Sequence, residues 1–128
     1  MLDTNTVSHL LKEHPVVVRH VVTTTMAALC ISAITEGELF FGLAKRPDAK
    51  QLHLVVREFL RRVDVLPWDS DTAELYGTVR ADMARQGKIL APLDLLIATH
   101  ALSVGAILVT NDQIFVRVNN LQVEDWTK

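Results

Sequence analysis

Cysteine, proline, glycine and aromatic residues are all scarce in this chain. Its 128 residues include one cysteine, four prolines, five glycines, two tryptophans, one tyrosine and four phenylalanines. The single Cys30 excludes an intrachain disulfide, and with it the small disulfide-stapled scaffolds of secreted proteins. The few glycines and prolines, beside 49% hydrophobic and 22% charged residues, exclude fibrous and low-complexity chains. We expect one globular domain over residues 1–128.

Long hydrophobic runs are also absent. The longest stretch nearly free of charge, 89–111, contains Pro92, Asp94 and Gly105, which argue against a membrane span. The opening Met1-Leu2-Asp3 lacks the basic start and apolar stretch of a signal peptide. We therefore expect a soluble, cytoplasmic protein with no membrane partner.

Short apolar strands alternate with helices along the chain. Apolar spacing, capping residues and breaking residues predict a helix from about residue 4 and helices over about 16–24, 32–45, 48–62, 69–86 and 92–103. Buried strands are predicted at 1–2, 28–32, 63–66, 106–110 and 121–126. This alternation favours right-handed crossovers and a parallel sheet covered on both faces. We expect an α/β fold, a three-layer α/β/α sandwich with a central parallel sheet of about four or five short strands.

Four carboxylates stand at the edges of apolar runs: Asp3, Glu38, Asp94 and Asp112. A carboxylate near a core loses hydration and needs a partner charge, a metal ion or a proton. Asp3 and Asp112 follow predicted strands, and ligands of parallel sheets bind at the carboxyl ends of strands. Carboxylate oxygens without His or Cys favour Mg²⁺ or Mn²⁺ over zinc. The pattern therefore indicates a divalent metal site at one edge of the sheet.

Each acid also has a simpler interpretation. Asp3 and Asp112 are good helix N-caps, and Asp94 in a first helical turn is favoured by the helix dipole. Glu36 competes with Glu38, because residues two apart on a helix point about 200° apart. Glu38 shares an apolar stripe with its helix neighbours, which favours it over Glu36.

The net charge of −2 does not decide between RNA and other partners. Without the four acids above, 11 acidic residues stand against 13 basic ones, and a bound metal ion would reverse the field around those acids. The charge balance therefore neither excludes nor indicates a polyanionic partner.

Four spaced motifs resemble the PIN-domain ribonucleases, and more narrowly the VapC toxins of bacterial toxin-antitoxin pairs. They are Leu2-Asp3-Thr4-Asn5, the stretch from Ile31 to Gly42 around Glu38-Leu39, Pro92-Leu93-Asp94 with Ile97-Ala98, and Val109-Thr110-Asn111-Asp112 with Phe115. The resemblance covers essentially the whole chain. It implies that the protein is a toxin and a hydrolase, an endoribonuclease dependent on Mg²⁺ or Mn²⁺.

The resemblance assigns roles to particular residues. Asp3, Glu38, Asp94 and Asp112 would be the catalytic, metal-binding acids, and hydrolysis would leave a 5'-phosphate and a 3'-hydroxyl. Asn5 and Thr110 match positions that steady such a cluster by hydrogen bonds. No histidine is needed as a base, so all five histidines are expected in structural or surface roles. They are His9, His14, His20, His53 and His100.

The resemblance also implies partners. The subgroup with Glu-Leu-Phe-Phe-Gly and Glu-Asp-Trp signatures is similar to toxins that cut the anticodon loop of initiator tRNA, so tRNA is the expected substrate. Candidate RNA backbone contacts, which can equally be solvated helix faces, are Lys45, Arg46, Arg80, Arg85 and Lys88. A homodimer is expected, as is a VapB-type antitoxin that covers the acids. The groove on this chain that would receive the antitoxin segment could be lined by five apolar residues, unless they are buried in the monomer. They are Phe40, Phe41, Leu43, Leu52 and Val56.

Other interpretations remain open at this point. A response-regulator receiver would need paired acids after its first strand and a lysine after its last, and a haloacid-dehalogenase-like phosphatase would need an acid where Asn5 stands. A non-catalytic PIN-fold RNA-binding or interaction module would be expected to lack one or more of the four acids. Only two residues precede Asp3, fewer than is common in the family, so its strand should be short, yet still pair with 107–109.

Overall fold

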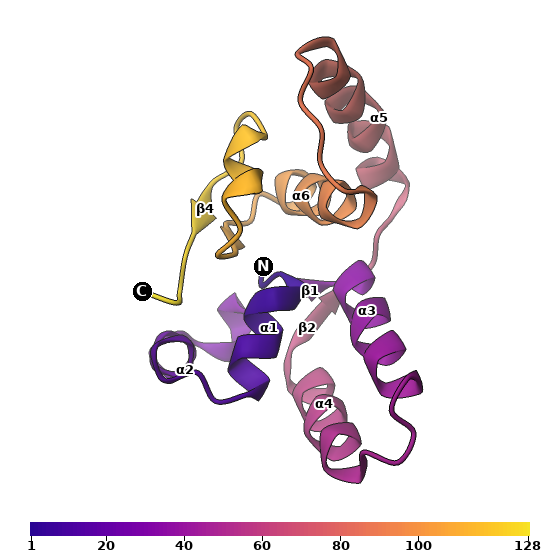
Figure 1. Ribbon diagram of the computed structural model, residues 1–128. Helices are drawn as coiled ribbons and strands as arrows, with labels where there is room; N and C mark the ends of the chain where they lie inside the picture. Colours follow the sequence, from indigo (N-terminus) through magenta and orange to yellow (C-terminus); the bar gives the residue numbers. More distant parts are fainter.

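We obtained a computed structural model of the chain that describes residues 1–128. Six α-helices and two short 3₁₀ helices surround four strands (Figure 1). The helices are α1 (Thr4–Leu11), α2 (Pro15–Val22), α3 (Ala33–Ala44), α4 (Lys50–Arg62), α5 (Ser70–Arg85), α6 (Pro92–Val104), η1 (Met26–Ala28) and η2 (Gln113–Arg117). None of these helices is long and apolar enough to cross a membrane.

The strands form two parallel pairs. Strand β1 (Cys30–Ser32) pairs with β2 (Asp64–Leu66), and β3 (Leu108–Val109) pairs with β4 (Val123–Glu124). Leu2 lies between the pairs, because its N–H donates to the Cys30 carbonyl at 2.9 Å and it forms a parallel bridge with Val109. The resulting order is β2–β1–Leu2–β3–β4, so a single residue takes the place of a central strand.

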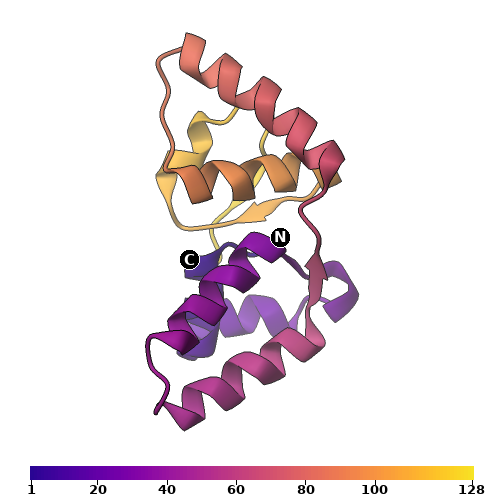
Figure 2. The ribbon, with the colours of Figure 1, turned by 90° about the vertical axis from the view of Figure 1, so that its right-hand side faces the viewer.

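Alternate strand residues point to opposite faces of this sheet, and each face has its own hydrophobic core. Met1 and Leu108 belong to the core beneath α5, α6 and η2, whereas Leu2 and Val109 belong to the core beneath α1, α3 and α4. Figure 2 shows α5 and α6 on one side of the strands and α3 and α4 on the other. The expected three-layer α/β/α architecture is confirmed.

Local sequence explains where the helices begin and end. Ser32 caps α3 by accepting the Ile34 N–H at 3.1 Å, and Pro92 is the first residue of α6. Gly105 ends α6 with a φ of 67°, in the left-handed region that favours glycine. The helix expected to open at Asp48 begins instead at Lys50 and has no side-chain cap.

The strands are shorter than the sequence predicts. Residues 28–32, 63–66, 106–110 and 121–126 were each expected to be extended, but only two or three residues of each stretch form ladder hydrogen bonds. The pairing predicted between the start of the chain and 107–109 is confirmed by the bridge from Leu2 to Val109. The backbone around Leu2 is held on both sides, which fixes the position of the following residue, Asp3.

Candidate active site

Asp3 and Asp112 lie where the chain leaves the central strands. The Asp3 Oδ1 accepts the Thr6 N–H at 2.7 Å and caps α1, and the Asp112 Oδ1 accepts the Ile114 N–H at 3.0 Å and caps η2. The capping interpretation is therefore correct for both residues. It does not exclude a second role, since a carboxylate has two oxygens and each cap uses only one.

Asp3 is the more buried of the two acids. Only 4% of its surface is exposed, and its backbone N–H donates to the Val109 carbonyl at 3.0 Å. The short first strand therefore still holds Asp3 firmly. The Asp3 side chain is fixed by the Thr6 N–H and its backbone by the Val109 carbonyl, so its carboxylate has little conformational freedom.

Glu38 reaches the same region from α3. The Thr4 hydroxyl donates to Glu38 Oε1 at 2.5 Å, which joins the start of α1 to the middle of α3. Glu36 has no such partner and is not among the charges that act on Asp94. Thr4 was not identified from the sequence, although its place directly after Asp3 was the available signal.

Asp94 lies in the first turn of α6, on the opposite side of the sheet from Glu38. Burial raises the pKa of the Asp94 carboxyl, and the negative charges of Asp112, Glu38 and Asp3 raise it further. The fold thus brings Asp3, Glu38 and Asp112 close enough to Asp94 for their charges to act on its carboxyl. No lysine or arginine forms an ion pair with any of them.

The donor set suits a hard divalent cation. All four side chains offer carboxylate oxygens, the ligands that Mg²⁺ and Mn²⁺ prefer, and their mutual repulsion is the field that a cation would neutralise. No three acidic, histidine or cysteine side chains are already close enough to hold one ion among them. The donor chemistry and the location at the strand ends therefore fit a metal site, although the side chains as placed do not bring three of these acids to one point.

Of the two residues predicted to steady the acids by hydrogen bonds, only one makes such a bond. Thr110 is buried, and its Oγ1 accepts the Asp112 N–H at 3.1 Å, so it steadies the turn that carries this acid. Asn5 is exposed and its side chain makes no hydrogen bond. The role of Asn5 stays a prediction.

His100 is fully buried beside this region. Its Nδ1 lies 2.7 Å from Ser32 Oγ, and the same oxygen accepts the Ile34 N–H, so the Ser32 hydroxyl hydrogen is free to face the imidazole. Burial lowers the pKa of His100, outweighing the opposite effect of the Asp69 carboxylate. The Nε2 atom has no hydrogen-bond partner. His100 thus ties α6 to the end of β1, the structural role expected of it.

A hollow of about 280 Å³ adjoins Glu38 between α1, α3 and α4. Three cations line it, namely Lys12, Lys45 and Arg46. Its apolar lining is Leu11, Leu39, Leu43, Leu52 and Val56.

The residues proposed for an antitoxin groove divide between core and surface. Leu43 and Val56 are buried in the monomer, Leu52 is partly buried, and Phe40 and Phe41 are 40% and 63% exposed. The hollow beside Glu38 therefore has an apolar floor without aromatic residues in its lining, and the exposed Phe41 ring lies next to it, 4.7 Å from the Nζ of Lys45.

The remaining basic candidates lie elsewhere. Arg85 is paired with Asp82, whereas Arg80 and Lys88 line a separate hollow between α5 and α6. The five basic residues considered from the sequence therefore do not form one continuous patch. Only Lys45 and Arg46 lie beside a predicted metal-binding acid.

Comparison with known proteins places this geometry in a family. Residues 1–121 match the model of the PIN domain. The chain is 40% identical over 128 residues to the tRNA(fMet)-specific endonuclease VapC of Shigella flexneri, covering 99% of this chain and 97% of that protein.

Solved structures agree with this comparison. The DNA-bound VapBC complex of Salmonella typhimurium contains a chain with a TM-score of 0.91 and 38% identity, covering 98% of this chain and 96% of that one. The VapBC2 complex of Rickettsia felis, bound to a promoter DNA fragment, gives a TM-score of 0.89 at 31% identity, covering 98% and 97%.

Proposed function

Because this chain belongs to the PIN domain family, and within it to the VapC ribonuclease toxins, we propose that its four clustered acids form a metal-dependent RNA-cleaving site. The protein is the toxin of a toxin-antitoxin pair. Asp3, Glu38, Asp94 and Asp112 bind Mg²⁺ or Mn²⁺. The observation that carries this assignment is the raised pKa of Asp94, which reflects burial and the three other carboxylates acting on one point.

The surrounding residues hold the acids in place for this chemistry. The Thr6 N–H fixes one oxygen of Asp3, the Thr4 hydroxyl fixes one oxygen of Glu38, and Thr110 fixes the backbone of Asp112. A divalent cation held by these four acids would supply a water of lowered pKa and charge stabilisation for the departing oxygen. Cleavage leaves a 5'-phosphate and a 3'-hydroxyl, and no histidine of the chain is required as a base.

The substrate we propose is the anticodon loop of initiator tRNA. The relatives from Shigella flexneri and Salmonella typhimurium carry the name tRNA(fMet)-specific endonuclease, at 40% and 38% identity. Unpaired loop nucleotides can enter an open site of this kind more readily than a duplex. Lys45 and Arg46, beside Glu38, are placed to contact the RNA backbone.

The test compares Glu38→Gln with Glu36→Gln. Both changes remove one negative charge from α3, but only Glu38 bonds to Thr4 and acts on Asp94. Purified proteins are incubated with initiator tRNA, elongator methionine tRNA or total RNA, in Mg²⁺, Mn²⁺ or EDTA, and the fragments and their ends are mapped.

Wild type and Glu36→Gln should cut initiator tRNA only with metal present, and Glu38→Gln should lose at least about 100-fold in rate, more than a supporting residue contributes. Equal cleavage by both variants would remove Glu38 from the site. Binding of tRNA without cleavage under any metal condition would favour a non-catalytic RNA-binding module instead.

We also propose that a VapB-type antitoxin occupies the hollow beside Glu38. VapBC complexes are the matching solved structures. The hollow combines an apolar floor with the edge of the acid cluster, so a bound segment could place an arginine among the carboxylates. Phe41→Ala, at an exposed position beside Lys45 of this hollow, should weaken antitoxin binding measured by calorimetry and leave RNA cleavage by the free toxin intact.

A homodimer is the expected state of the free toxin. Large apolar side chains are exposed on several elements of the monomer, and a dimer interface would need some of them to form one contiguous patch. They include Phe41, Leu54, Ile89 and Val116. Light scattering coupled to size-exclusion chromatography measures the mass directly, and a monomer across the working concentration range would contradict this part of the proposal.

A further inference from the structure

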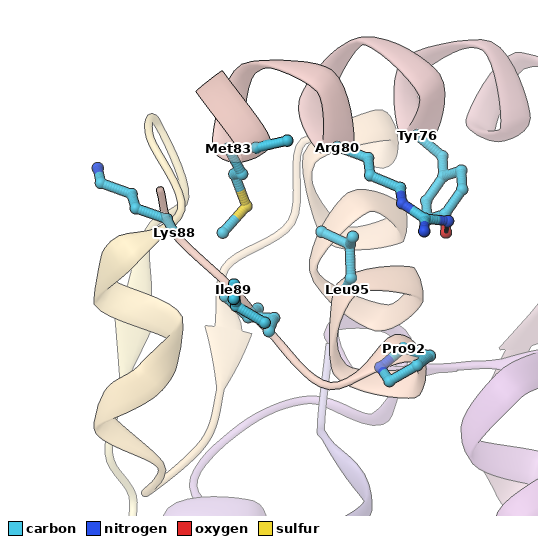
Figure 3. A pocket seen from close by; sticks show the side chains of 9 residues that line it. Tyr76, Arg80, Met83, Lys88, Ile89, Pro92 and Leu95 are labelled. Carbon is cyan, nitrogen blue, oxygen red and sulfur yellow. Dashed lines mark hydrogen bonds between the residues drawn. The ribbon is translucent and has the colours of Figure 1, made fainter. Parts of the chain in front are cut away.

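A second hollow lies among α5 and α6, apart from the hollow beside Glu38, which α1, α3 and α4 enclose, and nothing in the reaction above uses it. It has a volume of about 230 Å³ and lies between α5, the start of α6 and the segment that joins them. Figure 3 shows Tyr76 and Arg80 at one end and Lys88 at the other. Its remaining lining is Met83, Ala84, Ile89, Leu90, Pro92 and Leu95.

The lining has the two properties that a nucleotide needs. Arg80 and Lys88 are its only charged residues, so the hollow is cationic in a protein whose net charge is −2. The other residues offer apolar surface and one aromatic ring, against which a base can pack. Bases of single-stranded nucleic acid bind proteins through this combination of stacking and positive charge.

The walls of the hollow are fixed before any ligand arrives. Met83, Leu90 and Leu95 are at most 8% exposed and belong to the core. Tyr76 is packed edge-on by Trp68, whose indole N–H donates to the Leu96 carbonyl at 3.0 Å. Little conformational entropy is therefore lost when a ligand enters.

The segment after α5 is also held. The N–H of Lys88 donates to the Met83 carbonyl at 2.9 Å and that of Gly87 to the Ala84 carbonyl at 3.1 Å, the pair of bonds that closes a Schellman motif. Gly87 has a φ of 70°, as this motif requires. The motif leaves Ile89 projecting with 78% of its surface exposed at the rim of the hollow.

Arg80 is presented toward the hollow without an acidic partner. Its Nη1 donates to the Tyr76 hydroxyl at 2.9 Å and its guanidinium lies 5.9 Å from the centre of that ring. A guanidinium bound only to a phenol keeps its charge available to a phosphate. Lys88 extends from the other end of the hollow, where its ammonium lies 3.5 Å from Asn119.

The hollow and the acids share the first turn of α6. Pro92 and Leu95 line the hollow, and Asp94, between them in sequence, belongs to the acid cluster. Adjacent helical residues point about 100° apart, so this turn presents different faces to the two sites. An RNA strand that crosses the turn can contact both.

We propose that this hollow binds one unpaired nucleotide of the RNA substrate, with its base against Ile89, Pro92 and the Tyr76 ring and its phosphate at Arg80. The proposal rests on the proposed function, since it gives that reaction a subsite beside the cut. It makes Arg80, Tyr76 and Ile89 determinants of which RNA loop is accepted.

The test uses two variants. Ala84→Trp fills the hollow with an indole ring, and Arg80→Gln removes one of its two positive charges. Ala84 is exposed, so tryptophan there does not disturb the core. Arg85→Gln is the matched control, because Arg85 lies on the same helix but is paired with Asp82 outside the hollow. Circular dichroism and melting temperatures establish that each variant is folded.

Two measurements are made with oligoribonucleotides of the anticodon loop. The first is equilibrium binding in EDTA, where no cleavage takes place. The second is kcat/KM in Mg²⁺ or Mn²⁺ on the intact RNA and on a series with an abasic nucleotide at each position around the cut.

Ala84→Trp should bind and cleave the intact RNA about 5- to 100-fold less well, the range expected for loss of one stacked base. Arg80→Gln should lose about 5-fold, and Arg85→Gln should match wild type. Removing the base at one position of the RNA should lower kcat/KM of the wild type by the same factor as Ala84→Trp does on the intact RNA. For Ala84→Trp itself, removing that base should cause no further loss.

Unchanged binding by Ala84→Trp, or an equal loss on every abasic RNA, would overturn the subsite. Dissociation of a dimer by Ala84→Trp in light scattering would assign the hollow to a protein contact and likewise overturn it. The proposed function fails separately, when wild type cleaves no RNA with either metal.

Discussion

Thr4 shows how much of this site depends on a side chain that is not itself an acid. Its hydroxyl spans from the first residue of α1 to Glu38 on α3, two residues 34 positions apart in the chain. A hydroxyl that donates to a carboxylate oxygen both orients the group and stabilises its ionised form. The position of Glu38 is therefore set by the N-terminus of the chain as well as by its own helix.

Replacing Thr4 with valine should lower the apparent metal affinity and the cleavage rate about 10- to 100-fold, as is usual when a hydrogen bond to a metal ligand is lost. Thr4→Ser should retain most activity because it keeps the hydroxyl. The neighbouring Asn5→Ala tests the other residue expected to steady the acids, whose side chain makes no hydrogen bond; an unchanged rate would leave Thr4 as the supporting residue on α1. Rates and Mn²⁺ titrations measure both effects, and equal losses in the valine and serine variants would contradict the role of the hydroxyl.

Asp94→Asn should have opposite effects on activity and stability. Cleavage should fall at least about 100-fold, since a ligand is lost. The metal-free variant should melt at a higher temperature than wild type, because the raised pKa of Asp94 means that its ionised form is disfavoured in the folded protein. Thermal unfolding in EDTA at pH 7 measures the gain, and a variant that melts below wild type would show that the acids do not repel one another.

His100 makes the stability of the fold depend on pH. Its pKa is lowered from the ordinary 6.5, so below about pH 6.5 the unfolded chain binds a proton more readily than the folded protein does. The free energy of unfolding should therefore fall as the pH drops through this range. Asp94 affects the free energy of unfolding in the opposite direction. Because its pKa is raised in the folded protein, acidification protonates it there first, which removes a buried, repelled charge and stabilises the fold.

The His100 contribution is best isolated in the Asp94→Asn background. Urea unfolding between pH 7.5 and 5 should show a decreasing free energy of unfolding, and adding His100→Gln should flatten that slope. If the double variant keeps the slope of Asp94→Asn, the buried imidazole is not its cause.

At the scale of elements, the order of helices and strands could be predicted from the sequence, because it follows from apolar spacing and capping residues such as Ser32 and Asp69. The predicted meeting of acids at one sheet edge rests on the same topology. Strand lengths could not be predicted, since the number of ladder hydrogen bonds depends on the extent of the partner strand, which is distant in sequence. The bond from Thr4 to Glu38 and the partner of His100 were also out of reach, because each joins distant segments.

Leu2 alone links the two strand pairs, at a place where a longer central strand would otherwise lie. The residue is 1% exposed and belongs to the core beneath α1 and α3. Leu2→Ala should lower the free energy of unfolding by about 2–5 kcal/mol. It should also weaken metal binding, because Asp3 is held by the same backbone.

The matched control for Leu2→Ala is Leu54→Ala, which removes the same atoms from a side chain that is 68% exposed. Its effect should stay within about 0.5 kcal/mol. Urea unfolding compares the two variants, and a Leu2→Ala protein as stable as the control would mean that the two strand pairs do not need this link.

For the whole molecule, the four acids proposed to bind a metal ion connect the two outer layers. Glu38 comes from a helix packed on one face of the sheet and Asp94 from a helix packed on the other, with Asp3 and Asp112 at the strand ends between them. A cation bound by all four would join layers whose hydrophobic cores are separate.

Mn²⁺ should therefore stabilise the whole fold by mass action, by about 2.7 kcal/mol at one hundred times the dissociation constant. Hydrogen exchange should slow at the start of α6 and in α3 at the same metal concentration. Glu38→Gln should abolish most of this gain and Glu36→Gln should preserve it. Protection confined to one layer would argue against a site shared between them.

The brevity of β2 and β4 bears on how the protein avoids aggregation. Both are outermost strands, with only three and two residues in the ladder, and β2 begins with the exposed charge of Asp64 and is followed by Pro67, which has no N–H to offer. A sheet margin this short and interrupted is a poor template for another chain's strand. These two strands therefore offer little backbone for pairing with another chain, and self-association is left to side-chain surfaces.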